Sequence, residues 1–138
     1  MSQFIKSYRA EVGINHVPAY QVSGRPFASG SINATVSGGH KIEFPFVSRW
    51  IYVTNHGTTA CRVGYSQNGV LGSNYLRVAG VDDDGNTAPA TARLEVKVSE
   101  IWLSGSDSVD VMVGLTTIPV SRVSGSTGPS FSGSAGVG

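Results

Sequence analysis

Short runs in which apolar and polar residues alternate constrain this chain more than any other feature. Residues 92–98 (ARLEVKV) alternate cleanly, with Leu94, Val96 and Val98 on one face and three charged residues on the other. A period of two places successive side chains on opposite faces of a half-buried β-strand. No window of the sequence holds the i, i+3, i+4, i+7 pattern of an amphipathic helix. The sequence therefore predicts an all-β fold, with helix below about a tenth of the chain.

Strand-like runs follow one another through the middle of the chain. Residues 49–54 (RWIYVT) are rich in the aromatic and β-branched types that suit a pleated sheet. The Asn68-Gly69 pair predicts a hairpin turn, and Pro45 indicates a sheet edge or the end of a strand. The predicted strands are 41–46, 49–54, 61–65, 74–79, 92–98, 101–103 (an extension of the previous run or a separate strand), 109–115 and 118–123.

The spacing of these runs predicts the architecture. Seven to nine short strands, with turns about every 8–12 residues, are typical of a sandwich or barrel. The length fits a single eight-stranded jelly-roll-like sandwich or an immunoglobulin-like sandwich, and no Cys…Trp…Cys pattern supports the latter.

Three zones divide the chain. Residues 30–123 are the predicted β-sandwich core. Residues 1–29 are a predicted extended N-terminal arm with scattered apolar anchors, broken by Pro18 and Pro26. Residues 124–138 are a predicted C-terminal arm, because ten of the fifteen are Gly or Ser and such a segment buries too little apolar surface to fold alone. Both arms are expected to become ordered against another subunit.

The charge content excludes strongly charged partners. Charged residues make up only 14% of the chain and the net charge is +1, so no bulk field attracts nucleic acid or anionic lipid. We expect no nucleic-acid partner and no membrane span, and we see no signal-peptide run at the N-terminus. The single cysteine, Cys61, excludes an internal disulfide and is expected to be a buried structural thiol.

Catalytic and metal-binding signals are weak. Residues 82–86 (DDDGN) place acidic ligands at alternate positions, as a calcium loop does, but Thr87 and Arg93 stand where that loop needs Gly and Glu. The three histidines His16, His40 and His56 fit no metal-ligand spacing. We expect no catalytic residues, no metal and no cofactor, and predict that the protein is not an enzyme.

Aromatic side chains on the predicted strands allow two interpretations. They are Trp50, Tyr52, Tyr65, Tyr75 and Trp102. Such residues serve most often as core or interface residues, and core is the favoured prediction. Exposed in a concave patch beside polar neighbours, they would instead form a platform that stacks on sugars.

The order of these runs resembles a known class of protein. The carrying segments are FPFVSRWIYVTN (44–55), RVGYSQNGV (62–70), NYL (74–76), LEVKVSEIWLS (94–104) and VMVGLTTIP (111–119), with AYQVSGRPFASG (19–30) before them. The order of these strand and turn segments resembles that of small jelly-roll structural proteins of virus particles, especially the capsid-decorating, cement or minor capsid proteins of tailed phages and large DNA viruses. The resemblance implies a jelly roll that sits on or between major capsid proteins, often as a trimer, with no active site.

The expected function is therefore structural: a virion protein, assembled in the host cytoplasm, that binds major capsid proteins through its core and arms. The alternative is a head-fibre, tail or receptor-binding β-sandwich that recognises a glycan or host surface. The candidate partner-binding residues are Phe4, Tyr8, Tyr20, Phe27 and Phe131.

Overall fold

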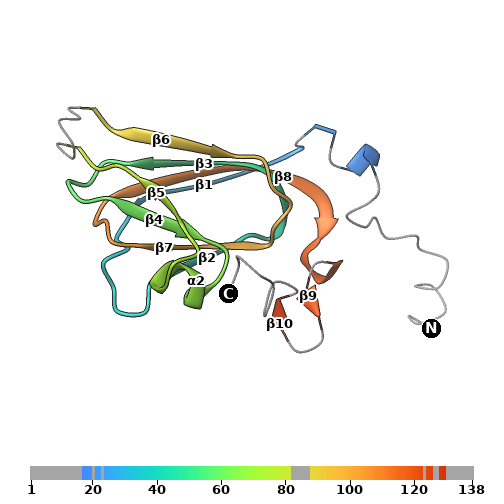
Figure 1. Ribbon diagram of the computed structural model, residues 1–138. Coiled ribbons are helices and arrows are strands. Elements are labelled where there is room, and N and C mark those ends of the chain that lie inside the picture. The colour runs from blue at the N-terminus through green and yellow to red at the C-terminus, as the bar shows by residue number, and fades with distance from the viewer. Residues whose placement is uncertain are drawn as a thin grey trace.

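The computed structural model describes residues 17–19, 21–22, 24–81, 88–122, 124–125 and 128–129. Over these residues it confirms the all-β prediction. Two four-stranded antiparallel sheets pack face to face as a β-sandwich (Figure 1). The strands are β1 (Arg25–Ile32), β2 (His40–Glu43), β3 (Phe46–Asn55), β4 (Cys61–Gly64), β5 (Leu76–Val78), β6 (Ala90–Leu94), β7 (Glu100–Ser104) and β8 (Val109–Pro119).

The strand pairing is nested. β1 pairs with β8, β2 with β7, β3 with β6 and β4 with β5, so the first half of the chain pairs with the second half in reverse order. Two further pairings, β3 with β8 and β4 with β7, join these strand pairs side by side. The resulting sheets have the orders β1-β8-β3-β6 and β2-β7-β4-β5.

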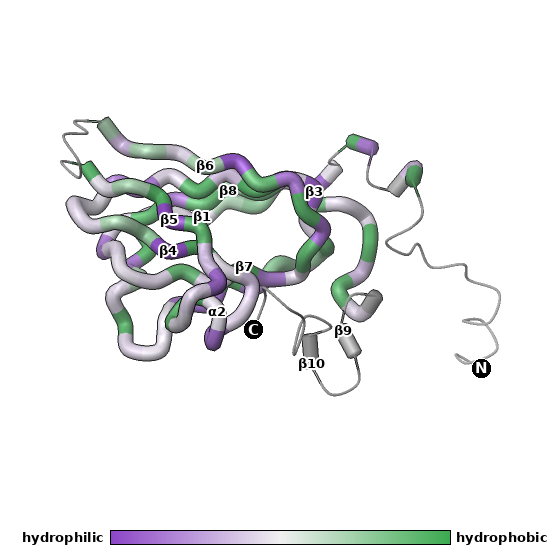
Figure 2. The backbone as a smooth tube through the Cα atoms, in the orientation of Figure 1, coloured by the Kyte–Doolittle hydropathy of each residue, from purple (hydrophilic) through white to green (hydrophobic). Residues whose placement is uncertain are grey.

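The core between the sheets consists of aliphatic side chains. Ile51, Ile101, Leu103 and Leu115 are fully or almost fully buried, and Phe44 is the one buried aromatic residue in the described part of the chain. Figure 2 shows the hydrophobic and hydrophilic residues alternating along strands such as β6. The prediction that the strand aromatics lie in the core is wrong for Trp50, Tyr52, Tyr75 and Trp102, which are half-buried or exposed, whereas Tyr65 packs against the core.

The predicted hairpin at Asn68-Gly69 is present, since β4 pairs with β5 antiparallel, but its predicted tight turn is wrong. Residues Gln67–Leu71 form a short helix, α2, in place of a two-residue turn. Ser66 caps this helix, because its hydroxyl oxygen accepts a hydrogen bond from the Gly69 N–H at 2.9 Å. Val70 is fully buried, so one turn of helix covers an open part of the core that a tight turn would leave exposed.

The structure decides one alternative that the sequence left open and corrects one predicted strand boundary. Residues 101–103 belong to a separate strand, β7, and the two runs 109–115 and 118–123 are joined in the single strand β8, followed by the 3-10 helix η3 (Val120–Arg122). β8 continues past an irregular register because the Thr116 hydroxyl donates to the Val47 carbonyl at 2.7 Å and accepts from the Ile118 N–H. The side chain thus satisfies backbone groups that the ladder leaves unpaired.

The structure also describes parts of both predicted arms. β1 begins at Arg25, so residues 25–29 of the predicted N-terminal arm belong to a sheet of the sandwich. Before it, η1 (Val17–Ala19) lies near β8. In the predicted C-terminal arm, β9 (Ser124–Gly125) and β10 (Gly128–Pro129) form a two-stranded ladder.

A buried amide ties together the loops at one end of the sandwich. The Asn55 side chain is fully buried at the end of β3. Its Nδ2 donates to the Thr59 and Val78 carbonyls at 2.8 and 3.1 Å, and its Oδ1 accepts from the Gly57 N–H and the Ser106 hydroxyl at 3.0 and 2.6 Å. All four hydrogen-bonding positions of the amide are filled, so the loops that connect the two sheets are held in one arrangement.

Candidate interaction face

The outer face of the β1-β8-β3-β6 sheet carries an unusual set of side chains. The strand register aligns Ala28, Met112, Tyr52 and Arg93 in one row across all four strands. Met112 is 55% exposed and Tyr52 is 36% exposed. Methionine, aromatic residues and arginine are enriched in protein interfaces relative to the rest of the surface. This row therefore has the composition of a contact surface.

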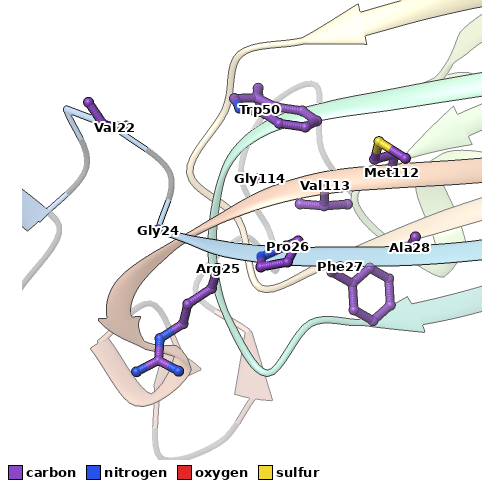
Figure 3. Close-up of a pocket in the computed structure, with 10 residues that line it drawn as sticks. All are labelled: Val22, Gly24, Arg25, Pro26, Phe27, Ala28, Trp50, Met112, Val113 and Gly114. Atoms are coloured by element: carbon purple, nitrogen blue, oxygen red, sulfur yellow. The ribbon is translucent and has the colours of Figure 1, made fainter.

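Two shallow grooves lie on either side of Met112. The larger, of about 600 Å³, is lined by Pro26, Trp50, Met112 and Gly114 together with Val22, Gly24, Arg25, Phe27, Ala28 and Val113 (Figure 3). The second, of about 410 Å³, lies between Tyr52, Met112 and Gly30 and reaches Asp110. Both include Ala28, so they form one continuous depression across the sheet, which we call the apolar groove.

The indole of Trp50 lies against the backbone of Gly114 in the neighbouring strand. A Cβ atom at Gly114 would lie 2.3 Å from the Trp50 ring, much closer than any real contact. Only glycine therefore allows the indole to lie across β8. The Trp50 and Tyr52 rings meet edge to face, with centroids 5.4 Å apart and planes at 73°. The aromatic pair is thus held in a fixed position at one end of the groove.

The segment before β1 is held at this end of the sheet. Arg49 Nε donates to the Gln21 carbonyl at 2.9 Å, and its Nη1 lies 3.3 Å from Glu95 Oε2. Val22 is 79% exposed and lines the apolar groove. The N-terminal segment therefore enters the sandwich beside the groove.

The opposite end of the groove is polar. Asp110 Oδ1 accepts the Ser31 N–H at 2.9 Å, and Asp110 Oδ2 lies 3.1 Å from His56 Nε2. Ser31 has a φ of 54°, in the left-handed region that non-glycine residues rarely adopt, at the irregularity between Ser29 and Ile32. The Asp110 carboxylate thus stabilises the irregularity in the ladder between β1 and β8, which resumes at Ile32.

The outer face of the β2-β7-β4-β5 sheet is different in character. Its outward side chains include Lys41, which pairs with Glu43 at 2.6 Å and with Glu100 at 3.8 Å. Trp102 Nε1 donates to Glu100 at 2.8 Å, so this aromatic residue is part of a polar network. We call this outer face the charged face, in contrast to the outer face that carries the apolar groove together with the Arg93–Glu95 pair.

Most of the predicted partner-binding residues lie outside the described residues; these are Phe4, Tyr8, Tyr20 and Phe131. Phe27 is described, and its ring packs against Phe44 with centroids 5.3 Å apart at the margin of the core. Met112 is not among the residues predicted from the sequence, and an exposed position for Trp50 and Tyr52 was only the alternative to the favoured core prediction. The alternation W-I-Y-V in β3 signals that Trp50 and Tyr52 share a face, but not that the face is the outer one.

The described residues contain no group of three or more His, Cys, Asp or Glu side chains placed to hold a metal ion. The acidic run 82–86 lies outside them. Cys61 is buried, as predicted, and burial raises the pKa of its thiol to about 11. In the same part of the chain no helix is both long and apolar enough to span a bilayer.

Comparison with known proteins gives no match: no family model, no curated protein and no solved structure is similar to this chain.

Proposed function

We propose that this chain is a structural protein of virus particles that attaches to neighbouring capsid subunits through the apolar groove. The nested pairing of eight strands into two sheets supports a jelly roll, the double Greek-key architecture that capsid proteins share with other families. The resemblance of the strand and turn segments to small jelly-roll capsid proteins supports the same class of protein. On this proposal the chain decorates or cements the capsid, with the trimer as the favoured oligomer.

The proposed attachment rests on one observation, which is the difference between the two outer faces of the sandwich. On the charged face, Lys41, Glu43, Glu100 and Trp102 satisfy one another through ion pairs and hydrogen bonds, and this network is suited to solvent. The other face exposes Met112, Tyr52 and the half-buried Trp50 around a groove, and gains free energy when a partner covers it. A protein partner fits this groove well, because Pro26, Ala28 and Met112 offer apolar contact with few hydrogen-bonding groups.

The test uses particles from the virus or host that carries this sequence. An antibody against the recombinant chain is expected to label intact particles in electron micrographs, and the chain is expected to co-purify with the major capsid protein. Particles reconstituted with Met112→Lys are expected to lose occupancy, because the substitution places a charge in the apolar groove. Leu71→Lys is the matched control, since Leu71 is similarly exposed, at 47%, but lies in α2, away from the groove. Absence of the chain from particles, or equal loss with both variants, would contradict the proposal.

The second candidate function is recognition of a glycan by the same groove. It is favoured by the position of Tyr52 beside Asp110 and Thr54, with the Trp50 ring next to Tyr52, since aromatic rings stack on sugars and the polar groups bind hydroxyls. The 73° angle between the two rings makes it the weaker candidate, because they present no common flat platform. Saturable quenching of tryptophan fluorescence by neutral oligosaccharides, lost in Trp50→Phe, would favour it over the structural function.

A further inference from the structure

A pair of arginines lies on the charged face, on adjacent strands. The antiparallel pairing of β4 and β5 places Arg62 directly opposite Arg77. The neighbouring residues Cys61, Val63 and Val78 point into the core, so both arginines point outward. Directly opposed side chains have Cβ atoms about 4.5–5.5 Å apart, and like charges in this relation are unfavourable. The sheet therefore concentrates two positive charges at one point.

Tyr75 holds both arginines in place. The Arg62 guanidinium lies over the Tyr75 ring, with Cζ 4.6 Å from its centroid. The Tyr75 hydroxyl is hydrogen-bonded by Arg77, and this bond, followed by the nearby charge of Arg62, lowers the pKa of Tyr75. One ring thus fixes two guanidinium groups whose mutual repulsion would otherwise separate them.

Three of the other basic groups provide a contrast, whereas Arg25, like Arg62, lies over an aromatic ring, that of Phe46, with Cζ 4.3 Å from its centroid. Among the described residues, Lys41, Arg49 and Arg93 each lie beside a glutamate: Glu43 and Glu100 for Lys41, and Glu95 for both arginines. Arg62 takes part in no ion pair within that part of the chain. Its positive charge is balanced by a π face and not by a carboxylate.

We propose that Arg62 and Arg77, bracketed by Tyr75, form a binding site for a sulfate or phosphate group. Guanidinium groups are planar forks whose N–H groups match pairs of oxyanion oxygens, and two opposed forks can hold one tetrahedral group between them. Ser104 pairs with Arg62 on its other side and adds a hydroxyl next to the site. The bound anion relieves the repulsion between the two arginines, so the site favours a compact tetrahedral oxyanion.

This site is independent of the proposed attachment function, because it lies on the sheet that does not carry the apolar groove. A subunit held through the groove would still present the arginine pair on its other face. The ligand group can arrive as a free ion or as a sulfate or phosphate ester on a sugar, and the test separates these sources.

The test is a titration of the full-length, ¹⁵N-labelled chain followed by NMR of the arginine Nε–Hε groups. Sodium sulfate and sodium phosphate are added at ionic strength held constant with sodium chloride, so that general screening does not change. The Arg62 and Arg77 signals are expected to shift and saturate with a Kd of roughly 1 mM, the affinity expected for a few charge-assisted hydrogen bonds at an exposed site. Galactose 6-sulfate is titrated in the same way, with galactose as its control. A lower Kd for galactose 6-sulfate than for sulfate indicates a sugar ester as the ligand, and a lower Kd for sulfate indicates the free ion.

Variants make the assignment specific. Arg77→Gln is expected to weaken binding about ten-fold or more, and Arg62→Lys also weakens it, because a lysine keeps the charge but loses the fork. Arg93→Gln is the matched control. Arg93 also lies over a tyrosine ring, that of Tyr52, but it belongs to the other sheet and forms an ion pair with Glu95. Binding in this control is expected to be unchanged. Shifts that do not saturate, or an equal response in Arg77→Gln, would mean an adventitious ion only and would overturn the proposal.

Discussion

Replacing Asn55 with Asp changes one buried NH₂ group into an oxygen and tests the loop-tying role of this residue. The substitution keeps the shape of the side chain and the two hydrogen bonds that its Oδ1 accepts. It removes the two bonds donated to the Thr59 and Val78 carbonyls, which then face an acceptor. Each buried polar group left without a partner costs about 1–3 kcal/mol, and an uncompensated buried charge costs about 3–5 kcal/mol. We therefore expect Asn55→Asp to lower the free energy of unfolding by about 3–5 kcal/mol.

The loss of stability in Asn55→Asp should depend on pH. Burial raises the pKa of the introduced carboxyl above the value of about 3.9 that it has in the unfolded chain. As the pH rises above that value, the unfolded state ionises first, so the variant loses stability until the pH passes the folded-state pKa. The deficit relative to wild type is therefore smaller near pH 4 than near pH 7. Urea unfolding at the two pH values, followed by circular dichroism, measures both quantities.

Two companion variants keep this prediction testable. Asn33→Asp makes the same chemical change at an exposed site where Oδ1 accepts from Thr35, and should change stability by less than about 0.5 kcal/mol. Ser106→Ala removes one of the four bonds to Asn55 and should cost about 1 kcal/mol, even if Asn55→Asp does not fold. A loss below about 1 kcal/mol for Asn55→Asp, or a loss that is the same at both pH values, would refute the reasoning.

Three further predictions follow from other features. Gly114→Ala should displace the indole of Trp50 and shift tryptophan emission to longer wavelength, whereas Gly24→Ala, with no atom within 4 Å of its added Cβ, should not. Burial raises the pKa of the Cys61 thiol from 9.0 to about 11, so above pH 9 the thiol ionises first in the unfolded chain. The free energy of unfolding should therefore fall by about 1 kcal/mol between pH 8 and pH 10. Urea unfolding measures this fall, with Cys61→Ala, which has no thiol, as the reference. Deleting residues 1–16 should leave the melting temperature nearly unchanged, whereas deleting residues 1–29 removes the start of β1 and should lower it strongly; equal effects would contradict the assignment of Arg25 as the start of the sheet.

The sequence alone determined the secondary-structure class and most of the strands, because period-two alternation depends only on local geometry. Residues 92–98 illustrate its limit: the alternation placed Leu94 and Val98 on the inner face correctly, but the ladder of β6 ends at Leu94. The helix α2 could not be predicted from Asn68-Gly69, since it depends on the burial of Val70 in a core built by distant strands.

Tertiary structure decided which face of each strand is exposed and which residues meet. Along β3 both faces are apolar, so the pattern could not show whether Ile51 and Val53 or Trp50 and Tyr52 point inward. The smaller, branched side chains fill the space between the two sheets, and the aromatic rings lie on the outer face, that of Trp50 over Gly114. Likewise, Arg62 and Arg77 become neighbours only through the register of β4 with β5, which no local pattern in the sequence encodes.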